Sequence, residues 1–352
     1  MENVNAHTHG KRTRIIVAIF CLAAAASIIY LCWPSAQQSL PMPPAPEPMD
    51  AEKVLLQAKE LSGTGNINQA IALLQQYTFE HAGEITVSPT LAKLYILTGQ
   101  HAKASELMAT LLKAQPDNPK ILWLRGELEK TSGKDPMPWF RQAAELPAAD
   151  NEIHTQYALM LWDAKQYKPA EAYIKKALAG GSQDARIHQL AGHIALKEGR
   201  LEDAKTLLVY ATEKDKQSAQ AWADLAETCK KLGQDKQAIA ALKHVLQYAR
   251  GDMRKNVLFE LAGMLVEQKE YMQAADTYVK AADAQPTLKR NCLLEAAKCY
   301  WRIGKYALAM KYIDIVYELQ PDDQEVTAWR TKIENARFGP VSGEAPKTQP
   351  AK

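Results

Sequence analysis

Two histidines are the side chains best placed to bind a metal in this sequence. His188 and His193 lie five residues apart in a segment with helical periodicity. Two imidazoles that bind one metal from a single helix are usually spaced i, i+4, as in an HExxH motif, and the sequence has no such motif. We therefore predict surface or groove histidines and no metal site.

Three cysteines, Cys229, Cys292 and Cys299, lie outside the apolar N-terminal segment. If Cys292 and Cys299 share a helix, their Cα atoms are about 10 Å apart. A disulfide tolerates at most about 7 Å between Cα atoms. We expect three buried free thiols, although an odd number of cysteines is unusual for an exported domain.

No nucleotide-binding or catalytic motif is present. Gly63-Thr64-Gly65 lacks the third glycine of a dinucleotide fingerprint, and the sequence has no GxxxxGK[ST] and no recognisable Ser or Cys nucleophile setting. The sequence thus predicts a protein that is not an enzyme, with no catalytic residue, cofactor or small-molecule substrate. With 43 Lys+Arg against 40 Asp+Glu, its net charge of +3 implies no broad phosphate-binding face and no nucleic-acid partner.

Small residues recur through most of the 352-residue chain at steps of 32 to 36 residues. This ladder consists of Ala58, Ala92, Gly126, Ala158, Gly192, Ala226, Ala262 and Ala297. A second alanine follows twelve residues later in every repeat except the third, which is two residues short and has Pro138 near the start of its second helix. We expect a shortened or kinked helix there.

A tight turn is predicted between the two small residues of each repeat. Six repeats have a glycine at this point, and Lys165 and Lys269 occupy the other two turns. Helix pairs joined by tight turns bury their facing stripes if small side chains let the backbones approach, and each pair leaves an apolar face for the next to cover. A bulky residue at Gly192 or Ala204 should therefore destabilise the array.

The small-x6-Gly-x4-Ala pattern resembles the tetratricopeptide repeat (TPR). The seventh repeat shows it as Leu261-Ala262, Tyr271, Ala274, Tyr278, Ala281 and Pro286. The resemblance covers residues 51–324 and implies an all-α fold, a right-handed α-solenoid of about eight repeats. The repeats start near Ala51, Ile85, Pro119, Asn151, Ala185, Ala219, Lys255 and Arg290. Residues 325–338 are predicted to form a capping helix.

In this family the concave surface is lined by the first helix of each repeat at positions 2, 5, 9 and 12. The resemblance therefore implies a groove that binds a protein or peptide, with packing against the neighbouring repeat as the alternative for some of these side chains. The candidate groove residues are Trp123, Leu159, Trp162, Arg186, His193, Glu227, Lys230, Asn256, Phe259, Val266, Leu294, Lys298 and Trp301. The lysine and asparagine pair of the chaperone-tail clamp is absent from every repeat.

Residues 15–33 carry no charge and as a helix would span roughly 28 Å, the thickness of a bilayer core. Lys11, Arg12 and Arg14 precede this segment, and no Lys or Arg follows it until Lys53, so residues 1–14 are predicted to be cytoplasmic and residues 15–33 to be a transmembrane signal anchor. A cleaved signal peptide is the alternative. Residues 34–50 read as a proline-rich linker and residues 339–352 as a disordered tail.

Together these features predict a bitopic protein of the bacterial inner membrane whose periplasmic TPR array binds a protein or peptide as a scaffold. Envelope protein assembly, secretion and cytochrome c maturation are the processes in which similar anchored arrays serve. The alternative is an import-receptor-like or regulatory TPR protein whose array lies in the cytosol, where free cysteines are usual.

Overall fold

The structure is a computed structural model, and it describes residues 50–338. Within this range it contains seventeen α-helices, one 3-10 helix and no β-strand, which confirms the all-α prediction. In chain order the elements are α2 (Ala51–Gly63), α3 (Ile67–Glu80), α4 (Ser88–Leu97), α5 (His101–Ala114), α6 (Pro119–Thr131), α7 (Met137–Glu145), α8 (Asn151–Asp163), α9 (Tyr167–Ala179), α10 (Ala185–Lys197), α11 (Leu201–Lys214), α12 (Ala219–Lys231), α13 (Asp235–Tyr248), α14 (Gly251–Glu267), α15 (Tyr271–Ala284), η1 (Pro286–Leu288), α16 (Lys289–Arg302), α17 (Tyr306–Leu319) and α18 (Gln324–Phe338).

The chain divides into two compact units, which meet in sequence between Val87 and Ser88. The described part of the first unit is the helix pair α2 and α3. Ala58, Ala70 and Leu74 are almost completely buried between these two helices. Both ladder positions of the first repeat therefore have the predicted role of a close-packed contact.

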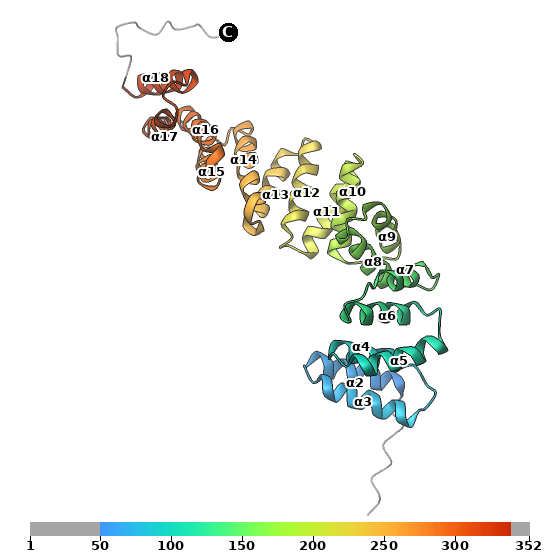
Figure 1. Cartoon of the computed structure of the whole chain (residues 1–352). Helices are drawn as coiled ribbons and strands as arrows, with labels where there is room; N and C mark the ends of the chain where they lie inside the picture. The colour runs from blue at the N-terminus through green and yellow to red at the C-terminus, as the bar shows by residue number, and fades with distance from the viewer. Residues whose placement is uncertain (1–49, 339–352) are drawn as a thin grey trace, which may run out of the picture. The chain divides into compact units, whose positions relative to one another are not determined.

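The second unit contains α4 to α18. Each first helix packs against its own second helix, and each second helix packs against the first helix of the next repeat, an order that can be followed along the colours of Figure 1. Two glycines show why the ladder needs small residues. A Cβ atom on Gly126 would lie 2.5 Å from Phe140 Cε1, and one on Gly192 would lie 2.6 Å from Leu208 Cγ.

The turns between paired helices require a left-handed backbone. The six predicted turn glycines have φ between 69° and 83°, and Lys165 and Lys269 have φ of 60° in the other two turns. They are the only described residues other than glycine with a positive φ. Since a side chain disfavours this conformation, the repeat geometry overrides the local preference of these two lysines.

The third repeat departs from the pattern as predicted. Its second helix, α7, has nine residues, whereas the other second helices have thirteen or fourteen. Pro136 and Pro138 lie at its start, and the Asp135 carboxylate accepts a hydrogen bond from the Met137 amide at 3.0 Å. Proline fits the first turn of a helix, so the helix begins there and is short rather than kinked.

Two helix starts differ from the prediction. In the second repeat α4 begins at Ser88 rather than Ile85, because Pro89 suits a first helical turn. In the seventh repeat α14 begins at Gly251, four residues before the expected Lys255. Asp252 in its first turn, which pairs with Lys255 at 2.9 Å, stabilises this extension.

The capping helix is present as α18. Its Val326 and Ile333 are completely buried, while most of its other side chains are exposed or half-buried. The Asp323 carboxylate accepts hydrogen bonds from the backbone amides of Glu325 and Val326, which caps the helix. None of the helices in residues 50–338 is long and apolar enough to cross a membrane. The predicted anchor at residues 15–33 lies outside the described residues, as do most of the linker and the tail.

Candidate peptide-binding groove

A groove of about 740 Å³ lies over the first helices α4, α6 and α8, with one side chain from the second helix α7. Its position on successive first helices agrees with the concave surface that the repeat pattern predicts. The lining residues are Pro89, Thr90, Lys93, Lys120, Trp123, Leu124, Glu127, Lys130, Phe140, Asp150, Glu152, Ile153, Gln156 and Met160.

Aromatic side chains form part of the floor of this groove. The rings of Trp123 and Phe140 lie 4.2 Å apart between centroids. Phe140 is buried and can approach α6 because Gly126 has no side chain. Trp123 is half-buried, and its indole N–H donates to the Glu127 carboxylate at 3.3 Å. A rigid, partly exposed tryptophan is a typical anchor for an apolar side chain of a partner.

Charged side chains surround the aromatic floor. Lys120 pairs with Asp150 at 3.2 Å, and the Asp150 carboxylate also caps α8 by accepting from the Ile153 amide at 3.1 Å. Glu152 accepts a hydrogen bond from Gln156 at 3.0 Å. Each carboxylate that lines the groove therefore has a partner within the protein.

A second hollow, of about 550 Å³, lies over α12, α13 and α14. Here the predicted groove residues are already paired: Lys230 with Glu260 at 2.7 Å, and Glu227 with Lys231 at 3.0 Å. The apolar Phe259 of α14 is 39% exposed. This part of the array offers fewer free charged groups to a partner than the α4, α6 and α8 groove.

Asp224 on α12 is a buried carboxylate, 4% exposed, that joins two repeats. It lies 3.3 Å from His193 Nδ1 and accepts hydrogen bonds from Gln220 at 2.9 Å and Gln189 at 3.4 Å. The hydrogen bond to Asp224 raises the pKa of the His193 imidazole. His193 is thus a partner of Asp224 and not a member of a histidine pair.

The thirteen predicted groove residues differ in exposure. Four are exposed: Arg186, Lys230, Asn256 and Phe259. Eight are half-buried: Trp123, Leu159, Trp162, His193, Glu227, Val266, Lys298 and Trp301. Among them Trp123 lines the α4, α6 and α8 groove, and Glu227 and Lys230 line the second hollow. Whether they bind a partner stays a prediction.

Leu294 requires a correction. It is 2% exposed and belongs to the same core cluster as Val326 and Ile333 of α18. This predicted groove position is therefore a packing position, the alternative that the sequence left open for some of these side chains. Its neighbour Trp301 is partly covered as well, since it packs edge-on against Trp329 of α18 at 5.5 Å between ring centroids.

The histidine and cysteine predictions have clear structural outcomes. His188 stacks on Tyr210 with ring centroids 4.0 Å apart, away from His193. In the described part of the chain, no three His, Cys, Asp or Glu side chains are grouped to hold a metal ion. Cys229, Cys292 and Cys299 are buried free thiols, as predicted. Burial raises the pKa of Cys292 and Cys299 to about 11.

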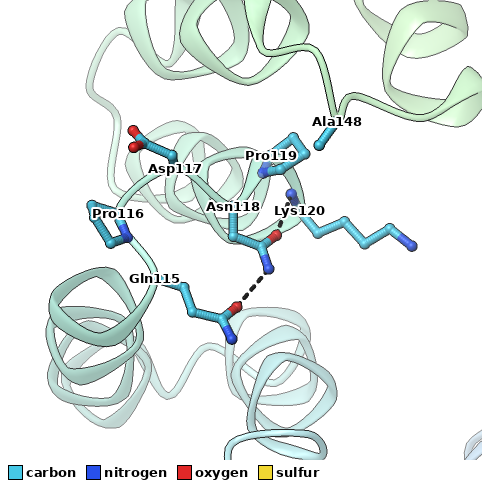
Figure 2. A pocket seen from close by; sticks show the side chains of 7 residues that line it. All are labelled: Gln115, Pro116, Asp117, Asn118, Pro119, Lys120 and Ala148. Carbon is cyan, nitrogen blue, oxygen red and sulfur yellow. Dashed lines mark hydrogen bonds between the residues drawn. The ribbon is translucent and has the colours of Figure 1, made fainter.

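A shallow hollow of about 580 Å³ lies at the loop between α5 and α6 (Figure 2). The Asn118 side chain points into the turn, where its oxygen accepts from the Lys120 amide at 3.0 Å and its nitrogen donates to Gln115 at 2.6 Å. Asn118 therefore caps α6, and its bond to Gln115 closes the turn, so these two side chains stabilise the loop.

Several groove residues were missed by the sequence reasoning. Lys93 is at position 9 of its repeat, so the position rule could have found it. Asp224 and Gln156 are at position 6, which the rule omits. Phe140 belongs to a second helix, and only the combination of Gly126 with the short third repeat could have indicated its approach to the groove.

Comparison with known proteins identifies the repeat. A family model of the tetratricopeptide repeat matches residues 61–128 and 195–255. These two segments of the chain match the tetratricopeptide repeat. Among curated proteins no sequence matches it.

Several solved structures are similar to parts of the chain. YrrB, described as a TPR protein with an unusual peptide-binding site, is 20% identical over 54% of this chain and 96% of its own, with a TM-score of 0.43. PilF of Pseudomonas aeruginosa is 20% identical over 62% of this chain and 99% of its own, with a TM-score of 0.38. MamA is 17% identical over 56% of this chain and 98% of its own, with a TM-score of 0.38.

Proposed function

We propose that this protein is a non-enzymatic scaffold whose TPR array binds a protein or peptide partner. The observation that carries the proposal is the groove of about 740 Å³ over α4, α6 and α8, which combines the half-exposed Trp123 with a rim of charged side chains. An apolar floor with a few polar groups suits an extended peptide, because aromatic anchors supply affinity and the polar rim sets register.

The proposed location is the bacterial inner membrane, with residues 15–33 as a single-pass anchor and the array in the periplasm. Lys11, Arg12 and Arg14 before the apolar segment support this orientation. Such a scaffold would serve envelope protein assembly, secretion or cytochrome c maturation. The buried free thiols favour the second candidate, an array in the cytosol, since reduced cysteines are usual there.

Site-specific photocrosslinking in intact cells tests the binding role. A photoreactive amino acid at Thr90 or Gln156 lies in the groove, and one at Lys113 lies on the exposed side of the second helix α5. We expect a discrete crosslinked protein from both groove positions and none from Lys113, with loss of the crosslink in Trp123→Ala. Equal crosslinking from all three positions, or none, contradicts a groove-binding scaffold.

Thiol labelling tests the location. Variants with a single cysteine at Ser35 or Ser342 are treated in intact cells with a reagent that does not cross the inner membrane. Labelling of both supports the periplasmic array. Labelling only after lysis supports the cytosolic alternative and leaves the scaffold role intact.

A further inference from the structure

Two ion pairs join neighbouring first helices in the later repeats. Lys298 is the residue after the ladder alanine of its repeat, and it pairs with Glu325 of the next first helix at 2.8 Å. Lys230 is the fourth residue after the ladder alanine of its repeat, and it pairs with Glu260 of the next first helix at 2.7 Å. At both positions a lysine is aimed at the following helix, where a carboxylate binds it.

The α4, α6 and α8 groove has lysines at the same two positions. Lys93 follows the ladder residue Ala92 directly, as Lys298 follows Ala297, and Lys130 is four residues after Gly126, as Lys230 is after Ala226. Both lysines are exposed and line the groove. Neither has an ion-pair or hydrogen-bond partner among residues 50–338.

The next helix explains why these lysines are unpaired. The residue equivalent to Glu325 is Lys120, which is a cation and cannot pair with Lys93; it is itself paired with Asp150. The residue equivalent to Glu260 is Gln156, which is neutral and donates its hydrogen bond to Glu152. The chain thus has the two cations here without the carboxylates that bind Lys298 and Lys230, and all four residues line one groove.

We propose, resting on the scaffold function above, that the groove binds an acidic, extended peptide segment of its partner. Two carboxylates of the segment pair with Lys93 and Lys130, and a bulky apolar side chain between them packs on Trp123. Asp150 is paired with Lys120, whereas Glu127 and Glu152 accept hydrogen bonds from the neutral Trp123 and Gln156 and keep their charge. Among the described residues no carboxylate lies within ion-pair distance of Lys93 or Lys130, so both lysines can pair with carboxylates of a partner. The partner supplies the carboxylates that Glu325 and Glu260 provide for Lys298 and Lys230.

A random twelve-residue peptide library, displayed on phage and selected on the full chain in a mild detergent, tests this chemistry. We expect the enriched peptides to carry Asp or Glu on both sides of an aromatic or large aliphatic residue. Binding of the enriched, fluorescein-labelled peptides is then measured by anisotropy. Lys93→Glu/Lys130→Glu should weaken binding by about tenfold or more, since each pair changes from attraction to repulsion.

Two further variants keep the test specific. Lys113→Glu/Lys236→Glu has the same net charge but changes exposed lysines on second helices, and it should bind like the unmodified protein. Gln156→Glu places a carboxylate at the position equivalent to Glu260, which binds Lys230 from the next repeat. It should therefore pair with Lys130 and weaken binding of the acidic peptides several-fold, while far-UV circular dichroism stays unchanged.

The outcomes separate the inference from the scaffold function. Peptides that lose binding in Trp123→Ala but bind Lys93→Glu/Lys130→Glu normally overturn the acidic-peptide inference and leave the groove function standing. Enrichment of basic peptides overturns the inference in the same way. If no peptide is enriched, or none responds to Trp123→Ala, both the inference and the proposed groove function are overturned.

Discussion

Replacing Gly192 with alanine tests the close helix contact on which the array depends. The new Cβ would lie 2.6 Å from Leu208 Cγ and 2.9 Å from Leu208 Cδ2, both in a completely buried side chain. Alanine stabilises a helix interior by about 1 kcal/mol relative to glycine. Overpacking a core costs about 1–3 kcal/mol. We expect a net loss of about 1 kcal/mol in the free energy of unfolding.

Gly263→Ala is the matched control. Gly263 lies within α14, and its nearest neighbour to an added Cβ is the Tyr278 hydroxyl at 3.8 Å, an ordinary contact. Here only the helix preference acts, so we expect a gain of up to about 1 kcal/mol. Urea unfolding of the full chain in detergent, followed by circular dichroism at 222 nm, measures both changes as differences in the free energy of unfolding.

A second substitution identifies the clash itself. Leu208→Ala costs stability by leaving a cavity, about 2–5 kcal/mol. In that background Gly192→Ala has room for its methyl group and should no longer destabilise, so the two substitutions are strongly non-additive. If Gly192→Ala stabilises the protein as much as Gly263→Ala does, the close contact between α10 and α11 is not what limits residue size at the ladder.

Three other perturbations give distinct results. Lys165→Gly should stabilise the protein by about 1 kcal/mol in the same urea assay, because the side chain opposes the positive φ at this turn; a loss of stability would contradict this. The raised pKa of His193 means that its pair with Asp224 contributes stability fully below the unfolded pKa of about 6.5 and loses it as the pH rises through the folded pKa. NMR titration should show this pKa falling in Asp224→Asn, and an unchanged pKa would refute the assignment. Cys292, with its pKa raised to about 11, should react with a thiol reagent at pH 8 only in denaturant; fast labelling of the folded protein would contradict its burial.

Much of the fold could be predicted from the sequence, because the repeat imposes the same packing problem many times. The small residue at Gly192 and the turn at Lys165 were predictable from period alone, and the structure explains both through a close contact and a positive φ. The short α7 followed from Pro138. Helix starts such as Gly251 were less predictable, since capping and ion pairs within one turn decide them.

The candidate site was less predictable. A repeat position gives the face of a helix but not what the neighbouring helix places against it. Leu294 is in the core even though its position is usual for a groove. Phe140 reaches the groove from a second helix only because Gly126 leaves room. Both outcomes depend on pairs of residues from different helices, which a single-helix pattern does not contain.

The pairing of the groove's charged side chains also depends on residues from two different helices. Lys130 and Lys230 occupy the same position of two repeats, but Lys230 is bound by Glu260, whereas the residue opposite Lys130 is Gln156. Availability of a lysine to a partner is therefore a property of two adjacent repeats and not of the lysine itself. An exposed ion pair contributes little stability, about 0–1 kcal/mol, so a Glu-to-Gln difference costs the fold little. Exchange of one side chain at this position can thus convert a repeat from one that binds its neighbour into one that offers a cation to a peptide.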